Sequence, residues 1–296
     1  MGEIESWTGT RRISWAAVPA PVRDAVEERL GARVTAAERL AGGFSEGVAA
    51  RLRLADGRDV FVKATADPAV RDFHRREGVI ASAFAVGVPS PPLLFALDLD
   101  PWVVLVFAFV EAELATEPDR PRVLDAATAM AAALTPAPAR PATAPRLGGF
   151  ADLSRPQVAR CSPWAAAHLD DLVELERSQD WAGDTLLHGD LYLFNALVSA
   201  QRVWIVDWAH AWVGPAYCDV LTVMAGSGGV PPETLLAGNA LTRDLPPPVV
   251  DGFLAAHAGF LVRLAVRASD PSLSAAAASL GRASLKWLAR RPYSAT

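Results

Sequence analysis

The amino-acid sequence predicts an α+β protein in which a small β-rich part precedes a larger, mainly helical part. Residues 34–110 hold alternating apolar runs separated by turn signals, with one long helical stretch among them. Beyond residue 110 the apolar spacing becomes that of helices, and the length of 296 residues suits two lobes. We therefore expect a small antiparallel sheet with one helix in residues 1–110 and a second, helical domain in residues 111–296.

Strand and turn signals carry the first half. Residues 48–54 alternate and run into Asp56-Gly57, a strong hairpin signal, after which residues 58–64 alternate again. A helix is expected over residues 69–86, because Pro68 precedes it and Gly87 ends it. Two apolar runs on either side of Asp100-Pro101, residues 93–99 and 102–110, suggest a further hairpin.

Helical signals dominate the second half. Helices are expected at 119–135, at 164–178 and in most of the chain after 216, and short β-like runs at 196–199 and 202–206. The segment 136–145 holds four prolines, which indicates a loop.

Composition excludes several classes of function. The net charge of −5 and the pI near 5.6 argue against nucleic acid as a partner. The N-terminal residues are polar, and the most apolar run, 102–110, is shorter than the ~20 residues of a membrane span, so we expect no secretory signal and no membrane partner. Two cysteines cannot build a disulfide framework, which favours a cytoplasmic protein.

The strongest local signal is HGDLYLFN at residues 188–195, followed by VWIVDW at 203–208. It sets Asp190 five residues before Asn195, and Asp207 after a β-like run. Phosphoryl transfer needs a carboxylate that orients the attacking hydroxyl, and an amide oxygen and a second carboxylate that hold magnesium. Each residue alone could be a turn former or a helix cap. The ordered set is far less expected by chance.

This run resembles the catalytic loop of the aminoglycoside phosphotransferase and choline kinase family, whose pattern is H-G-D-x-x-x-x-N followed by [IV]-D-[WF]. The resemblance implies a protein-kinase-like two-lobe fold, with residues 1–110 as the nucleotide-binding lobe. It also implies that Asp190 is the catalytic residue. Asn195 and Asp207 would bind Mg²⁺. His188 would support the loop, and Asp219, in GPAYCD at 214–219, would buttress it.

The first half offers the other parts that a kinase needs, in the expected order. Gly42, Gly43 and Ser45 lie in a loop between two predicted strands, where they could cover phosphates; a plain turn is the alternative. Lys63 ends a predicted strand and is one of only two lysines, so it resembles the family's phosphate-binding lysine rather than a solvated cation. Glu77 would be its partner, unless it pairs with Arg75 or Arg76.

The resemblance also implies that the nucleotide base binds to backbone near Ala108 and Val110. ATP is the expected nucleotide, GTP is not excluded, and the protein is expected to be a monomer or a homodimer.

The acceptor is expected to be a small molecule with a hydroxyl group. An antibiotic is one reading, with resistance as its consequence. Basic residues outnumber acidic ones after residue 220, which weakens an aminoglycoside and favours a less cationic nucleoside-, peptide- or macrolide-like compound. The acidic run at 164–184 could attract a cation or be a solvated face. A metabolic kinase for homoserine, choline, a sugar or a fructosamine, and a non-catalytic kinase-like binding protein, are the alternatives.

Overall fold

The computed structural model describes residues 13–40, 47–226 and 232–291, and these form two compact units. Of the described residues, unit 1 comprises 13–40, 47–85, 90–112 and the short segment Asp207–Ala209. Unit 2 comprises Val86–Pro89, Glu113–Val206, and the described residues 210–226 and 232–291.

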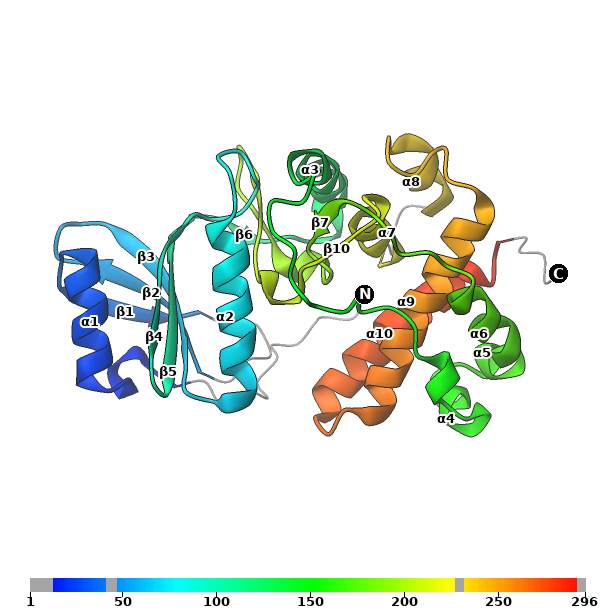
Figure 1. Ribbon diagram of the computed structural model, residues 1–296, viewed down its shortest axis with the longest axis horizontal. Coiled ribbons are helices and arrows are strands. Elements are labelled where there is room, and N and C mark those ends of the chain that lie inside the picture. The colour runs from blue at the N-terminus through cyan, green and yellow to red at the C-terminus, as the bar shows by residue number, and fades with distance from the viewer. Residues whose placement is uncertain (1–12, 41–46, 227–231, 292–296) are drawn as a thin grey trace. The chain divides into compact units, whose positions relative to one another are not determined.

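Unit 1 is built on an antiparallel sheet (Figure 1). Within the described residues it has five strands in the order β1-β2-β3-β5-β4, so that β3 lies at its centre. The predicted hairpins are confirmed, because β2 pairs with β3 and β4 pairs with β5. The strands are β1 (Val34–Arg39), β2 (Val48–Leu54), β3 (Asp59–Thr65), β4 (Leu93–Leu99) and β5 (Trp102–Ala108).

Two helices cover opposite faces of this sheet (Figure 1). One is α2 (Pro68–Ser82), which was expected. The other is α1 (Ala20–Leu30), so the expectation of one helix in this part was wrong. Signals for α1 were present: a proline in its first turn, and Gly31 after it at a φ of 70°. Its buried valines pack with β2 and β3 in one apolar cluster.

Unit 2 is mainly helical, and the prediction of an α+β fold with a helical second part is confirmed. Its helix α9 packs against α10 and α6, and α3 packs against α7. The helices are α3 (Arg120–Ala133), α4 (Arg155–Ala159), α5 (Pro163–Ala167), α6 (Leu169–Arg177), α7 (Tyr217–Ala225), α8 (Pro232–Gly238), α9 (Pro247–Arg267) and α10 (Pro271–Leu288).

Short strands accompany these helices. β7 pairs with β10, and β8 lies between β6 and β9. These strands are β6 (Glu113–Leu114), β7 (Thr185–Leu187), β8 (Ala196–Val198), β9 (Val203–Ile205) and β10 (Trp212–Gly214). Short 3₁₀ turns are η1 (Trp15–Ala17), η2 (Glu117–Asp119), η3 (Phe150–Asp152), η4 (Leu193–Asn195) and η5 (Trp208–His210).

The helix expected over residues 164–178 is divided into α5 and α6. The break lies at His168, whose backbone leaves the helical region at φ −105° and ψ 24°. Its ring stacks on Trp164 at 4.6 Å between centroids, and its Nδ1 lies 2.9 Å from the Trp164 carbonyl oxygen. These local contacts hold the chain in the non-helical turn.

Helix α9 is the longest element of unit 2 and was not singled out as apolar from the sequence. Within the described residues it is the one helix long and apolar enough to cross a membrane, by length and composition alone. However, 72% of its apolar window is buried inside the protein, as in the core helix of a folded domain. The fold itself accounts for its apolar composition.

The face of the sheet under α2 supplies a test of the fold. Leu105 in β5 is fully buried beside Ala81 and Phe107, whereas Leu94 in β4 is 45% exposed. We expect Leu105→Ala to lower the free energy of unfolding by about 2–5 kcal/mol, because it removes buried methyl groups and leaves a cavity. Leu94→Ala is the matched control and should change it by less than about 0.5 kcal/mol. Urea unfolding followed by circular dichroism measures both, and equal effects would contradict this packing.

Candidate active site

A lysine held by two carboxylates lies at the centre of unit 1. Lys63 Nζ is 2.9 Å from both carboxylate oxygens of Glu77 and 3.2 Å from Oδ1 of Asp207. Glu77 is 14 residues from Lys63 along the chain and Asp207 is 144. Arg75, the alternative partner of Glu77, instead pairs with Asp72 and Asp98.

The alternation of β3 explains this arrangement. Val60, Val62 and Ala64 face the apolar cluster with α1, so Phe61 and Lys63 must face α2 on the other side of the sheet. Glu77 lies on the buried side of α2 and is 2% exposed. An unpaired carboxylate at that depth would be costly, and the ammonium of Lys63 compensates it.

Ion pairing between Lys63, Glu77 and Asp207 shifts the pKa values of this cluster. Burial acts to lower the pKa of Lys63, but the carboxylates of Asp207 and Glu77 outweigh it and raise that pKa, so the lysine is cationic. Burial raises the pKa of Glu77, Lys63 opposes this, and the nearby charge of Asp207 raises it further. Two carboxylates thus share one ammonium, and an additional cation would be favoured there.

Asp207 occupies an uncommon backbone conformation. Its φ of 70° is the one positive value among the non-glycine residues that the structure describes. Asp tolerates this left-handed region better than most side chains, and residues held in it cluster at functional sites. Asp207 lies two residues after the end of β9, and its carboxylate points toward Lys63.

In unit 2, the predicted catalytic loop joins β7 to β8 and is fixed by buried groups. His188 is fully buried, and both of its ring nitrogens are used. Its Nδ1 accepts from the amide of Asp190 at 3.2 Å, which assigns the proton to Nε2, 2.9 Å from the Val206 carbonyl oxygen. This imidazole therefore ties the loop to the end of the following hairpin.

Asp219 supports the same loop from the first turn of α7. Its two carboxylate oxygens accept from the amides of His188 at 2.7 Å and Gly189 at 3.0 Å. Burial raises the pKa of Asp219, while His188 and the two amides oppose that rise. Gly189 has a φ of 75°, and a Cβ there would clash with the His210 carbonyl, so only glycine suits this turn.

Asp190 and Asn195 lie together in the loop, where Asn195 is buried and the Asp190 side chain is 20% exposed. The Asn195 amide nitrogen donates to the Asp190 carbonyl oxygen at 2.8 Å and to its Oδ2 at 3.3 Å. Because the nitrogen makes both bonds, the amide oxygen, which is the atom able to bind a cation, is not used in them. This orientation fits the role that the sequence predicted for Asn195.

The donor set suits magnesium bound mostly by phosphate and water. Across residues 13–40, 47–226 and 232–291, no three His, Cys, Asp or Glu side chains gather into a metal cage. Magnesium usually keeps several waters and needs only one or two carboxylates besides the phosphates of its nucleotide. The Asn195 amide oxygen in unit 2 and the Asp207 carboxylate in unit 1 are each donors of that kind.

Sequence reasoning missed Arg146, which pairs with Asp190. Arg146 Nη1 lies 2.8 Å from Asp190 Oδ1, and both side chains are about four-fifths buried, with exposures of 22% and 20%. Arg146 directly follows the segment 136–145, which was read as a simple loop. No pattern in the sequence links Arg146 to a residue 44 positions later. The only local feature of the sequence at this point is the proline-rich segment that precedes it.

A pocket of about 340 Å³, a volume that includes open solvent at its mouth, adjoins this ion pair within unit 2. Two consecutive buried hydrogen bonds lie at its wall: Tyr192 Oη is 2.8 Å from His257 Nε2, and His257 Nδ1 is 2.8 Å from Ser284 Oγ. Burial lowers the pKa of His257 to about 3, so its imidazole is neutral at pH 7. The pocket is lined by Arg146, Leu147, Gly189, Asp190, Tyr192, Trp212, Cys218, Asp219, Thr222, Phe253, His257 and Phe260.

The remaining predicted residues have mixed outcomes. Gly42, Gly43 and Ser45 lie outside the described residues. Ala108 ends β5, and its amide donates to the Pro92 carbonyl at 2.9 Å, so that N–H is already engaged. Val110 lies two residues beyond the strand.

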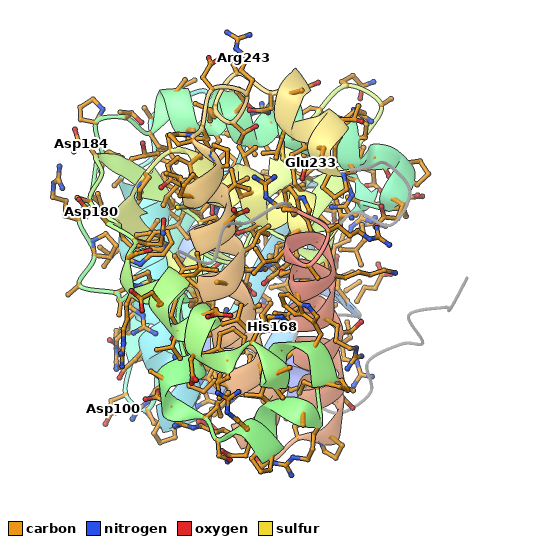
Figure 2. The ribbon with its side chains drawn as sticks, turned by 90° about the vertical axis from the view of Figure 1, so that its right-hand side faces the viewer. Asp100, His168, Asp180, Asp184, Glu233 and Arg243 are labelled. Carbon is orange, nitrogen blue, oxygen red and sulfur yellow. The ribbon has the colours of Figure 1, made fainter. Side chains whose placement is uncertain are left out.

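The acidic run at 164–184 is largely a solvated face. Asp170 pairs with Arg155 and Asp184 with Arg140. Figure 2 shows Asp180 and Asp184 at the edge of the molecule in that view. Glu176 is different, because it turns inward and accepts from backbone amides at residues 149–151.

One unit pairs a strand lysine with a helix glutamate, and the other holds an Asp–Asn loop. In a kinase-like fold this combination is typical of phosphotransferases. Residues 36–268 match the phosphotransferase enzyme family (APH). The match spans most of the chain, so this protein belongs to that family, and the prediction of a small-molecule kinase is confirmed at that level. A comparison with curated protein sequences gives no match.

Solved structures support the same fold. An aminoglycoside phosphotransferase APH(4)-Ia variant with ADP and hygromycin B is 16% identical, with a TM-score of 0.60, over 92% of this chain and 100% of that one. The macrolide 2'-phosphotransferase MphH of Brachybacterium faecium is 18% identical, with a TM-score of 0.57, over 88% and 98%. A protein of Thermobifida fusca assigned as a fructosamine-3-kinase is 19% identical, with a TM-score of 0.58, over 90% and 98%.

The Lys63 pair gives a prediction within unit 1. We expect Glu77→Gln to lower the free energy of unfolding by about 1.5–3 kcal/mol at pH 7, because it removes a charge-assisted contact from a buried cation. Asp72→Asn is the control: it lies on the same helix, is exposed, and should change stability by less than about 0.5 kcal/mol. Thermal and urea unfolding measure both. Two equally stable variants would show that the pair is not structural.

Proposed function

We propose that this protein is an ATP- and magnesium-dependent kinase that phosphorylates a hydroxyl group of a small molecule. The observation that carries the proposal is the capture of Lys63 by both Glu77 and Asp207. Phosphoryl transfer on a kinase fold uses a strand lysine paired with a helix glutamate, together with an aspartate that binds magnesium. Lys63, Glu77 and Asp207 match these three parts.

Each residue has a distinct part in this proposal. Lys63, held by Glu77, would bind the phosphates of ATP as a compact positive charge. Asn195 and Asp207 would hold magnesium, which supplies neutralisation of the phosphate charge when bound. His188 and Asp219 fix the loop so that Asp190 needs no rearrangement, and preorganised charge of this kind contributes much of the rate enhancement in such reactions.

Asp190 would orient the acceptor hydroxyl and take its proton. The acceptor oxygen forms a bond to the γ-phosphorus, and the bond from that phosphorus to the β–γ bridging oxygen breaks. ADP leaves with the electron pair of that bond, and the phosphorylated acceptor is released. The proton then passes from Asp190 to solvent.

The surroundings of Asp190 favour an acceptor that is not a polycation. Arg146 already occupies one oxygen of that carboxylate, and a cationic acceptor would have to compete with it. This supports the less cationic antibiotics and metabolites without a net positive charge over the aminoglycosides and choline. Resistance to an antibiotic stays a prediction, since the names of the similar structures apply to those proteins.

Asp190 gives the first functional prediction. We expect Asp190→Asn to lower kcat by a factor of about 10²–10⁴, the usual contribution of a positioned proton acceptor, while leaving ATP binding intact. Mass spectrometry of ATP-supplemented reactions over a panel of antibiotics and hydroxy metabolites identifies the acceptor, and ADP release then measures the rate. Asp170→Asn, an exposed aspartate of unit 2, is the control. Wild-type turnover by Asp190→Asn on the identified acceptor would refute its role.

Asp207 gives the second functional prediction. We expect wild-type protein to gain thermal stability with Mg·ATP and much less with ATP alone, and Asp207→Asn to lose most of the magnesium-dependent part. The reason is that an uncharged amide oxygen binds Mg²⁺ more weakly than a carboxylate does, and Asn195 already contributes one amide. Asp180→Asn is an exposed control that should keep the full shift. If Mg·ATP binds but no acceptor on the panel gains a phosphate, the binding-protein alternative replaces the kinase.

A further inference from the structure

The residue that carries a further inference is Arg146, whose guanidinium faces the pocket in unit 2. Its Nη1 is committed to Asp190, yet a guanidinium has five N–H donors in a planar fork. Its remaining edge is therefore available for a second oxygen ligand. The phosphotransferase role of Asp190 does not by itself call for an arginine on the same carboxylate.

The backbone that carries Arg146 is anchored independently of Asp190. We call residues 146–151 the strap. The amide of Gly148 donates to the Ala256 carbonyl of α9 at 2.6 Å. Glu176 accepts from the amides of Gly149, Phe150 and Ala151 at 3.0, 3.3 and 3.2 Å.

The strap also packs closely on α9. Gly149 has a φ of 151°, and a Cβ there would come within 2.7 Å of the Gly259 carbonyl oxygen. The guanidinium of Arg146, at the start of the strap, lies 4.7 Å from the centre of the Phe260 ring and makes a cation–π contact with it. Arg146 is thus held in place by its own backbone and by Phe260, as well as by its ion pair.

The other charged groups near the pocket are already engaged. Asp219 is 3% exposed, and both of its oxygens accept backbone amides. His257 is neutral at pH 7. Arg263, whose guanidinium lies 5.9 Å from the Phe260 ring centre, pairs with Asp152 at 2.9 Å. Among the described residues that line the pocket, Arg146 and Asp190 are therefore the charges that an acceptor would meet.

We propose that Arg146 is a specificity-determining residue that binds an acidic group, such as a carboxylate, on the acceptor. Through Nη1 it keeps Asp190 in place, and through its other N–H groups it binds the acid, so that the acceptor hydroxyl is presented to Asp190. Arginine suits this role because its fork matches a carboxylate bidentately. The inference rests on the proposed kinase function and narrows its acceptors to hydroxy acids.

Matched ligand pairs test this directly. The probes are hydroxy acids and their primary amides, which have nearly the same size and differ in charge; 4-(hydroxymethyl)benzoate and 4-(hydroxymethyl)benzamide are one pair, and aliphatic pairs complete the panel. Dissociation constants are measured by calorimetry or ligand-observed NMR on the full chain without ATP. In the wild type we expect at least one acid to bind tenfold more tightly than its amide, equivalent to about 1.4 kcal/mol.

Variants separate the role of Arg146 from general charge and from folding. Arg146→Gln should reduce the preference for the acid to less than about twofold, and Arg146→Lys should restore part of it. Arg155→Gln removes a cation at the distant Asp170 pair and should keep the full preference. Circular dichroism and thermal unfolding confirm that each variant is folded.

The possible outcomes have distinct meanings. Absence of any preference for the acids across the panel, including absence of binding, overturns the role of Arg146. The same holds if cationic hydroxy amines bind best and Arg146→Gln strengthens them. Neither result affects the kinase proposal, which is tested separately by the Mg·ATP shift and by phosphate transfer. Failure of those two measurements with a preserved acid preference would instead sink the kinase and leave an acid-binding pocket.

Discussion

The sharing of one ammonium by two carboxylates is the interaction on which unit 1 depends. Lys63 comes from the central strand β3, Glu77 from the helix that covers it, and Asp207 from a turn 144 residues away. Lys63 and Glu77 are buried and would be costly without each other, whereas the Asp207 side chain is 40% exposed and adds its charge from the open side of the pair. The same contact leaves more negative than positive charge around the ammonium, which is the electrostatic condition that binding of a metal–nucleotide complex exploits.

Unit 2 uses the opposite strategy, in which neutral backbone groups do most of the positioning. The carboxylate of Asp219 and the imidazole of His188 are spent on amides and carbonyls of the loop, and neither faces the pocket with an open charge. This leaves Asp190 as the charged side chain of the loop that lines the pocket without being used by backbone groups, with the buried Asn195 directly behind it. A loop fixed by buried donors and acceptors needs little reorganisation when ligands arrive.

Much of this arrangement could be predicted from the sequence because its parts are local. The strand period fixed the side of the sheet on which Lys63 lies, and short spacing linked Asp190 to Asn195. Arg146 could not be found in the same way, since its contacts to Asp190 and Phe260 arise from tertiary packing of a proline-rich loop. Helix α1 had recognisable end signals, but its apolar pattern was weak. The stronger strand patterns that follow it in the sequence dominated the prediction for this part of the chain.

The anchoring of the strap has an evolutionary consequence. Glu176 and α9 form hydrogen bonds with the main chain of the strap and not with the guanidinium of Arg146. The conformation of the strap therefore does not depend on which side chain stands at position 146. A single codon change there would exchange the charge offered to the incoming molecule while the scaffold beneath stayed intact. At such a position, related enzymes can change the acceptor that they bind without a loss of folding stability.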